Sequence, residues 1–371
     1  MSPASNTTVP ILDLTPEIEE LWDDLNAAFQ RVVRSGQFIL GPEVEAFERE
    51  VADYLGVKYA IGVNSGTDAL VIGLRAIGIG PGDEVITTPF SFFATAESIS
   101  NVGATPVFVD IDERTFNIDP NLIDGAITPR TKAIMPVHLY GRPCEMDAIM
   151  AIAKQHRLEV IEDCAQSFGA RFQGQQTGTF GAVGAYSFFP SKNLGGFGDG
   201  GMIVTDDDGV ALTARKLRAH GSIQKYQNEM LGYNSRLDAL QAALLRVKLP
   251  HVERWNRRRY EAAGRYESLL ATVDGVRTPE LPDGHVVHQY TIRISGGRRP
   301  RVTEMLQEHG VQSAVYYPVP QHRLPATTFL APSRCPIAER IALDVLSLPI
   351  GPSIREAEQR RVIDAVAQVR L

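Results

Sequence analysis

The sequence predicts an α/β protein with a large, mostly parallel sheet domain followed by a smaller C-terminal α+β domain. Between residues 57 and 205, short β-rich runs alternate with helical patterns. The β-rich runs are mostly continuous apolar segments, as expected for strands that are covered on both faces of a sheet. Beyond residue 250, one clear β-rich run (288–294) lies among helical segments. We therefore assign residues 1–250, with an N-terminal helical segment, to the large domain and residues 251–371 to the small one.

Seven runs are predicted to form the strands of the large sheet. In chain order they are 59–63, 83–88, 105–110, 132–137, 158–163, 184–189 and 201–205. Helical patterns between several of these runs predict parallel strands joined by right-handed crossovers. The last run follows a glycine-rich connection that is too short for a crossover helix. We therefore expect this last strand to run antiparallel at an edge of the sheet.

Helices are predicted on either side of these strands. The segment 42–56 has the spacing of an amphipathic helix that ends at Gly56, and its apolar positions are Val44, Phe47, Val51 and Leu55. The segment 235–270 is one long helical stretch in which Pro250 predicts a kink. A final helix is expected from about residue 354.

Composition limits the possible partners. The chain has 371 residues, is 44% hydrophobic, and carries a formal net charge of -7, which argues against general nucleic-acid or anionic-membrane binding. Its three cysteines are scattered and indicate neither a disulfide framework nor a metal site. The N-terminus lacks the features of a signal peptide, and no apolar run reaches the roughly 20 residues needed to cross a bilayer. We therefore expect a cytoplasmic protein without a metal.

The segments that follow the predicted strands contain the groups that could bind a ligand. In doubly wound sheets, ligands bind beyond the carboxyl ends of the strands. Gly66 and Thr67 follow the first strand and open a helix, whose free N–H groups favour a phosphate, although a plain helix cap would look the same. Phenylalanines follow the second strand and are either core residues or a stacking surface. Asp163 lies at the end of the fifth strand, and Lys192 follows the sixth.

One cofactor requires all four of these features together. Pyridoxal 5'-phosphate has a phosphate, a flat ring, a ring nitrogen that a carboxylate can keep protonated, and an aldehyde that forms a Schiff base with lysine. Lys192 is the single cation in the stretch 187–201. Its apolar neighbours Phe188, Phe189 and Pro190 would lower the pKa of the amine, which must be neutral to attack a carbonyl.

The stretch 196–201, "GFGDGG", also matches the G-x-G-x-x-G pattern of dinucleotide-binding proteins. That pattern requires a strand before it and a helix after it, whereas here a loop precedes it and a β-rich run follows. We therefore interpret these glycines as a flexible segment that lets the backbone pass close to Lys192.

The motifs of the chain resemble those of the DegT/DnrJ/EryC1/StrS family of sugar aminotransferases, which have the aspartate-aminotransferase-like fold type I. The matching stretches cover nearly the whole chain and include "NSGTDAL", "TPFSFFATAESI", "VHLYG", "IEDCAQSFGA", "SFFPSKNLGGFGDGG", "GYNSRLDALQAA" and "YYPVP". The resemblance implies transamination of a keto group on a nucleotide-linked sugar, with pyridoxal phosphate (or its amino form) as cofactor and L-glutamate as the usual donor. The products would serve amino-sugar, polysaccharide or secondary-metabolite biosynthesis.

The same resemblance assigns roles residue by residue. Lys192 resembles the Schiff-base lysine, and Asp163 the partner of the ring nitrogen. The remaining cofactor-binding residues would be Gln166 at the phenolic oxygen, Phe92 (or its rival Phe93) against the ring, and Gly66, Thr67 and Ser187 at the phosphate. Asn234 resembles a residue that reaches the phosphate in the neighbouring subunit, which implies a homodimer with shared active sites. Arg236, Tyr317 and His322 are the expected substrate-binding residues.

Other readings remain open. A sugar dehydratase branch of the family has histidine in place of the lysine, so Lys192 argues against it; a non-enzymatic sensor on the same fold is the second alternative. We expect His138 and His220 to be structural histidines, and His285 and His288 offer too few ligands for a metal site. The sequence leaves the nucleotide, the sugar and the position of amination open, with a lean towards 3-keto sugars by analogy.

Overall fold

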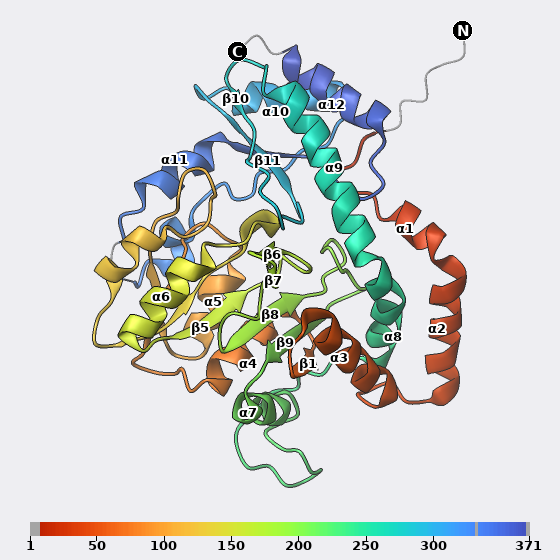
Figure 1. The fold of residues 1–371 in the computed structure, drawn as a ribbon, viewed down its shortest axis with the longest axis vertical. Coiled ribbons are helices and arrows are strands. Elements are labelled where there is room, and N and C mark those ends of the chain that lie inside the picture. The colour runs from red at the N-terminus through yellow and green to blue at the C-terminus, as the bar shows by residue number, and fades with distance from the viewer. Residues whose placement is uncertain (1–7, 331–332, 369–371) are drawn as a thin grey trace.

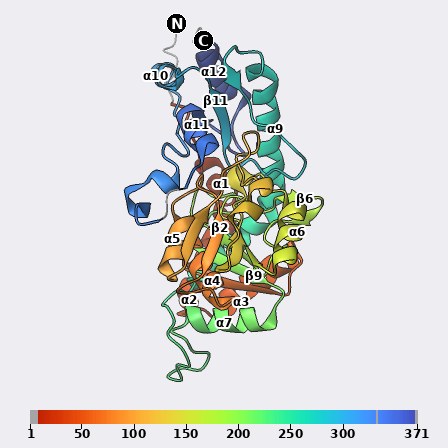
Figure 2. The same cartoon turned by 90° about the vertical axis from the view of Figure 1, so that its left-hand side faces the viewer.

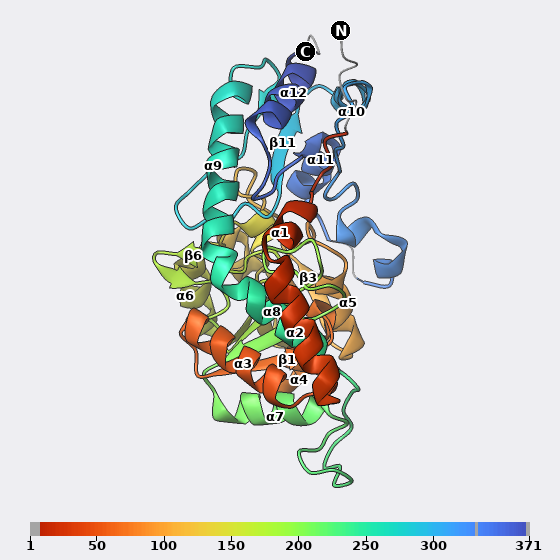
Figure 3. The same ribbon diagram turned by 90° about the vertical axis from the view of Figure 1, so that its right-hand side faces the viewer.

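A computed structural model describes residues 8–330 and 333–368 of the chain. In Figure 1, an α/β part occupies the lower half and a smaller α+β part the upper half. The long helix α9 (Val252–Leu270) runs from one part to the other, as Figure 3 shows from the side. The predicted combination of a large sheet with a smaller C-terminal α+β region is thus confirmed, and the fold is that of an α/β protein.

The large sheet has seven strands in the order β1-β9-β8-β5-β4-β2-β3. Their bounds in that order are Tyr59–Val63, Gly201–Thr205, Val183–Ser187, Glu159–Asp163, Thr131–Met135, Glu84–Thr87 and Thr105–Phe108. The five strands from β8 to β3 are parallel to one another. Because β5 and β8 are neighbours, the carboxyl ends of both strands lie at the same edge of the sheet.

The strand after the glycine segment, β9, departs from the prediction in one respect. It runs antiparallel to β8, as expected, but it also pairs with β1 and therefore lies inside the sheet. The prediction of an edge position was wrong, because β1 forms the edge. The outer side of β1 is protected by side chains: the Gly62 N–H donates to Glu48 Oε1 (2.8 Å) and the Gly62 carbonyl accepts from Arg218 Nη1 (2.8 Å).

Helices cover both faces of this sheet. One face packs against α4 (Gly66–Ala76), α5 (Ala94–Asn101) and α7 (Asp208–Arg218). The other packs against α3 (Pro42–Leu55), α6 (Met146–His156) and α8 (Ala239–Lys248), with α2 (Trp22–Ser35) against α8. Figure 2 shows α5 and α6 on opposite sides of β2. As predicted, α3 ends at Gly56, which has the left-handed φ of 74°.

The smaller part is built on an antiparallel sheet of three strands. These are β10 (Val276–Arg277), β11 (Tyr290–Ile294) and β12 (Val345–Leu348). They are accompanied by α9, α10 (Arg299–Glu308), α11 (Pro336–Asp344) and α12 (Glu356–Ala367). Further short elements include α1 (Thr15–Glu20), the hairpin of β6 (Arg171–Phe172) and β7 (Gln175–Gln176), and several 3-10 turns. Across the two described ranges, no helix has the length and apolar character that a membrane crossing requires.

Two features concern the predicted boundary between the domains. The helical stretch 235–270 is divided into α8 and α9 by a 3-10 turn, Leu249–His251, which contains Pro250. The N-terminal segment reaches the C-terminal part, where Val9 forms a β-bridge with Val311 and packs in the same core. The division into 1–250 and 251–371 stays a prediction.

Candidate active site

The sheet brings together Asp163 and the stretch that contains Lys192. Asp163 is the last residue of β5 and lies opposite Ala185 in β8. The chain leaves β8 at Ser187, and Lys192 follows in the next turn, where its N–H donates to the carbonyl of Phe189 (2.8 Å). The charges of Lys192 and Asp163 interact electrostatically. The site is therefore a consequence of strand order, because β5 and β8 are adjacent and parallel.

Asp163 is buried, and each of its carboxylate oxygens has a donor. Oδ1 accepts from the Ala165 N–H (3.1 Å), and Oδ2 accepts from the Thr95 hydroxyl (2.9 Å). Burial raises the pKa of Asp163 above its ordinary value, while the bonds from Thr95 and Ala165 and the charge of Lys192 lower it in part. Each oxygen keeps a free lone pair, so the carboxylate can still accept a hydrogen bond from a ligand.

Thr95 is a site residue that sequence analysis missed. Its hydroxyl also contacts the Ser91 hydroxyl (2.9 Å), which forms a chain from Ser91 through Thr95 to Asp163. Because Thr95 donates its only proton to the carboxylate, Ser91 must donate to Thr95. The sequence shows only that Ser91 and Thr95 are four residues apart and flank Phe92 and Phe93, which does not place either hydroxyl at Asp163.

We expect Thr95→Val to lower kcat about 10- to 100-fold, because it removes a hydrogen bond to a buried charge. Without this bond the pKa of Asp163 would rise further. The carboxylate would then be less able to keep the ring nitrogen of the cofactor protonated. Steady-state kinetics should show the loss in kcat with little change in KM for the amino donor. Thr95→Ser keeps the hydroxyl and should retain most of the activity. Equal losses in both variants would contradict this role.

Lys192 has an amine that is ready to react. Within the described ranges, Nζ has no hydrogen-bond or ion-pair partner, and it interacts electrostatically with Asp163 and His288. Burial lowers the pKa of Lys192 to about 8, although the negative charge of Asp163 opposes the shift. A substantial fraction of this amine is therefore neutral and nucleophilic near neutral pH.

This pKa predicts how the apoenzyme captures its aldehyde ligand. The rate constant for covalent capture of pyridoxal phosphate should rise with pH through about 8 and level off above it, because the neutral amine is the reactive form. Stopped-flow absorbance of the apoenzyme measures this rate directly. An ordinary surface lysine would give a rate that still rises at pH 10. A profile of that kind would contradict the lowered pKa of Lys192.

Gln166 has a fixed orientation beside Asp163. Its Oε1 accepts from the Tyr140 N–H (2.7 Å), and its Nε2 donates to the Tyr317 hydroxyl (3.1 Å). The Tyr317 ring lies 6.5 Å from the ring of Phe92, measured between centroids. Phe92 is 60% exposed, whereas Phe93 is partly buried. A large exposed aromatic ring next to buried polar groups is typical of a ligand-binding surface, which favours Phe92 over Phe93.

Gly66 and Ser187 are in close contact at the start of α4. Ser65 caps this helix by accepting from the Asp68 N–H (3.1 Å), which leaves the N–H groups of Gly66 and Thr67 free of the helix. A Cβ atom on Gly66 would lie 2.6 Å from Ser187 Cβ, so only glycine permits this approach. The free amides, a hydroxyl and the helix dipole together form an arrangement suited to a phosphate.

Other predicted residues lie elsewhere. Asn234 and Arg236 line an open cavity of about 520 Å³ together with Asn64 and Asp199. The side chain of His322 is buried and its Nε2 bonds to Glu339 (2.9 Å), which gives it a structural partner. A role of His322 in substrate binding stays a prediction.

His138 is fully buried between two protein partners. Its Nδ1 accepts from the Cys144 N–H and its Nε2 contacts Glu162, both at 3.0 Å. Cys164 lies near this pair, and the three residues could form a metal site by proximity. However, Glu162 already accepts from the N–H groups of Gly178, Phe180 and Gly181. This network accounts for His138 as a structural residue, as predicted.

The comparisons with known proteins match this arrangement. Residues 20–367 fit the model of the "DegT/DnrJ/EryC1/StrS aminotransferase family". The chain belongs to this family. The resemblance inferred from the motifs is therefore confirmed, and the protein is an aminotransferase of this family.

Curated relatives of this aminotransferase span almost its whole length. A "pleiotropic regulatory protein" of Geobacillus stearothermophilus is 50% identical over 97% of this chain and 98% of its own. A UDP-N-acetyl-3-dehydro-alpha-D-glucosamine 3-aminotransferase of Acidithiobacillus ferrooxidans is 48% identical, with the same coverage. A dTDP-3-amino-3,4,6-trideoxy-alpha-D-glucose transaminase of Streptomyces venezuelae is 47% identical over 99% of this chain and 97% of its own.

Solved structures agree with the fold of this aminotransferase. The crystal structure of S. venezuelae DesV has a TM-score of 0.95 and 47% identity, and covers 98% of both chains. The structure of NtdA from Bacillus subtilis, solved with bound cofactor PMP, has a TM-score of 0.90 and 35% identity, and covers 97% of this chain and 83% of that one. The predicted aspartate-aminotransferase-like fold type I is thereby confirmed.

The groups around Lys192 fit pyridoxal phosphate. The cradle of Gly66, Thr67 and Ser187 matches a phosphate, and the lone pairs of Asp163 match a protonated ring nitrogen. The Lys192 amine, which has no hydrogen-bond partner among the described residues, can react with the aldehyde. The phosphate, the ring nitrogen and the aldehyde of the cofactor would thus each meet a residue of complementary chemistry.

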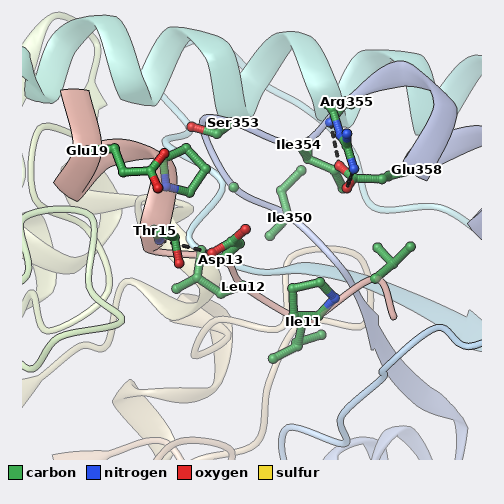
Figure 4. A pocket seen from close by; sticks show the side chains of 14 residues that line it. Ile11, Leu12, Asp13, Thr15, Glu19, Ile350, Ser353, Ile354, Arg355 and Glu358 are labelled. Atoms are coloured by element: carbon green, nitrogen blue, oxygen red, sulfur yellow. Dashed lines mark hydrogen bonds and ion pairs between the residues drawn. The ribbon is translucent and has the colours of Figure 1, made fainter. Parts of the chain in front are cut away.

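A separate cavity of about 420 Å³ lies between the N-terminal segment and the start of α12 (Figure 4). Several of its polar groups bond to one another: Arg355 binds Glu358, and Asp13 accepts from the Thr15 N–H (2.9 Å). None of the predicted site residues lines this cavity. It therefore adds nothing to the site around Lys192.

Proposed function

We propose that this aminotransferase uses pyridoxal phosphate to transfer an amino group from L-glutamate to a keto group of a nucleotide-linked hexose. The observation that carries the proposal is the constellation of Lys192 with the buried side chains of Asp163 and Gln166, in which the amine has no competing partner among the described residues. Two relatives support carbon 3 as the position, since one is named a 3-aminotransferase and the other is named for a 3-amino sugar. A 4-keto sugar is the other acceptor to be tested.

The cofactor residues would act as follows. Gly66, Thr67 and Ser187 hold the phosphate, Phe92 covers one face of the ring, and Gln166 Nε2 donates to the phenolic oxygen. When bound, pyridoxal phosphate supplies a carbonyl that exchanges with amines and a ring that withdraws electrons from the bond to be broken. Asp163 keeps the ring nitrogen protonated. Burial of its carboxylate strengthens this interaction, since both charges are shielded from water.

Lys192 would have two successive roles. Its neutral amine first holds the cofactor covalently, and its lowered pKa favours that form. Once the amino donor is bound, the free Nζ would be the base that accepts the proton from the α-carbon of glutamate and gives it up again. The same amine would move the proton in the opposite direction when the sugar is aminated.

We further propose that the protein is a homodimer whose two active sites each use both chains. The helix α2 exposes a second apolar face, with Trp22 at 60%, Phe29 at 45% and Val33 at 46% exposure. Phe38 and Ile39 continue this surface beyond the end of the helix. An apolar stripe of this kind favours burial against another protein surface. Asn234 is exposed in the nearby open cavity, where it is free to reach a partner.

Mixing two inactive variants tests the shared sites. In Lys192→Ala the amine is missing, and in Asn234→Asp a carboxylate repels the cofactor phosphate. A hybrid dimer would contain one site with both defects and one with neither. After reversible dissociation of an equal mixture, about one quarter of wild-type activity should return, since half of the dimers are hybrids. Absence of recovery in verified hybrids would contradict the role of Asn234 in a neighbouring site.

The proposed reaction is tested with a panel of UDP- and dTDP-linked 3-keto and 4-keto hexoses. Each is incubated with the purified holoenzyme and L-glutamate, and mass spectrometry detects exchange of the keto oxygen for an amino group. L-Aspartate and L-glutamine serve as alternative donors, and Lys192→Ala as the negative control. Amination of a 3-keto sugar from glutamate supports the proposal, and lack of product with every keto sugar and donor contradicts it.

A regulatory role without catalysis is a second candidate, because the relative at 50% identity is named a pleiotropic regulatory protein. A regulator needs no reactive amine, whereas Lys192, Asp163 and Gln166 are all present here. The two functions differ in one optical observation. An active transaminase that is yellow when purified should lose that colour on addition of glutamate, while a sensor would keep it.

A further inference from the structure

A small cavity lies beside the turn that holds Gln166. The turn is the 3-10 segment Leu139–Gly141, and the cavity has a volume of about 10 Å³. Its lining comes from three parts of the chain: the loop before Phe116, the segment after Tyr140, and the stretch 279–291. A volume of this size holds one water molecule.

Three residues that line this cavity each have a buried polar atom without a partner. Among the described residues, Arg142 Nη1, His285 Nδ1 and Gln289 Oε1 meet no hydrogen-bonding group. Two of these residues are held by another of their polar atoms: Arg142 Nη2 donates to Glu280 (3.1 Å) and His285 Nε2 contacts the Tyr140 carbonyl (3.2 Å). Leaving three such atoms unpaired would be costly, because each lost its bonds to water on folding.

The chemistry of the three atoms restricts what can bind between them. A carbonyl only accepts, so His285 Nε2 carries the proton towards Tyr140 and His285 Nδ1 is an acceptor. Burial and, to a smaller extent, the charge of Arg142 lower the pKa of His285 to about 4, against the raising effect of its hydrogen bond to the Tyr140 carbonyl, so the ring stays neutral. The ligand must therefore accept one hydrogen bond from Arg142 and donate two, to His285 and Gln289. An anion cannot donate them, and a metal cation would be repelled by Arg142.

We propose that this cavity binds one ordered water molecule, which accepts from Arg142 Nη1 and donates to His285 Nδ1 and Gln289 Oε1. The water joins the turn at Tyr140 to the segment before β11. It satisfies all three buried atoms with three hydrogen bonds, the usual number for an internal water.

The water site is connected to Gln166 through Tyr140. The Tyr140 carbonyl accepts from His285 Nε2 and also from the backbone N–H of His288 (2.8 Å). Tyr140 has a left-handed backbone conformation (φ 58°). Its carbonyl therefore faces the segment that contains His285 and His288, while its N–H donates to Gln166. A water that fixes the position of the His285 ring therefore also fixes the turn that orients the Gln166 amide. This last step rests on the proposed function, in which Gln166 binds the cofactor.

The first test is a crystal structure of the holoenzyme at a resolution that reveals ordered solvent. We expect one water within hydrogen-bond distance of Arg142 Nη1, His285 Nδ1 and Gln289 Oε1. A cavity without solvent density, or one filled by a rotated side chain, overturns the site. The presence of the water is observed without measuring activity, so this test can fail while the proposed function holds, and the reverse.

The second test replaces Gln289 by an apolar side chain of similar shape. Gln289→Met removes one acceptor, so the water should disappear and the melting temperature should fall by about 1–2 °C. The dissociation constant of the apoenzyme for pyridoxamine phosphate, measured by calorimetry, should rise about fivefold because Gln166 is less firmly held. Gln155→Met makes the same change on the exposed surface of α6 and should alter neither value. Loss of the water with unchanged affinity would overturn the link to Gln166.

Discussion

Lys192→Ala should fold normally and lose transamination by at least about 10⁴-fold. Within the described ranges the amine has no hydrogen-bond or ion-pair partner, so its removal leaves no buried group unpaired. The variant lacks both the covalent anchor for the cofactor and the base that moves the proton. Single-turnover assays with glutamate measure the loss, and circular dichroism verifies the fold.

Reductive labelling checks the same assignment independently of turnover. Sodium borohydride should fix the cofactor covalently on Lys192 in the wild-type holoenzyme, and peptide mass spectrometry should locate it there. Lys192→Ala should remain unlabelled. Lys154→Ala, which removes an exposed lysine of α6, should label at Lys192 and retain full activity. Label on any lysine other than Lys192 would exclude it as the anchor.

Asp163→Asn should bind the cofactor and lower kcat about 10²–10³-fold, the usual cost of removing a preorganised electrostatic group. The amide has the shape of the carboxylate, and the Ala165 N–H and the Thr95 hydroxyl can both adapt to it. What is lost is the negative charge that keeps the ring nitrogen protonated. The loss should appear in kcat, because the charge acts on the reacting state, while KM for glutamate changes little.

The absorbance spectrum provides the second readout for Asp163→Asn. The bound cofactor should titrate differently with pH in the variant, since its ring nitrogen no longer faces a carboxylate. Asp283→Asn removes an exposed carboxylate and serves as the control, with wild-type kcat and spectrum expected. Near-normal turnover in Asp163→Asn would remove this residue from the reaction.

Much of the candidate site follows from local sequence patterns. The continuous apolar runs predict covered strands, and the residues just after such strands lie at one edge of the sheet. This reasoning singled out Asp163 and Lys192 as the partners of a cofactor. It could not reveal Thr95, because a threonine in a helix is ordinary and acquires its role only when β2 and β5 bring its helix to Asp163.

Position within the sheet also depends on contacts that no local pattern encodes. The strand β9 was expected at an edge, yet it lies between β8 and β1, because strand order depends on which surfaces pack together across the chain. The same holds for Gln166, which is oriented by Tyr140 and Tyr317, residues 26 and 151 positions away.

The sequence by itself determined the fold class, the seven covered strands and the isolated lysine, since each depends on the polarity of neighbouring residues. The tertiary structure decided which side chains hold Asp163 and Gln166 and where the N-terminal segment packs. The physical reason is that hydrogen bonds and ion pairs act over a few ångströms in space. Their partners become neighbours only after distant segments have folded against one another.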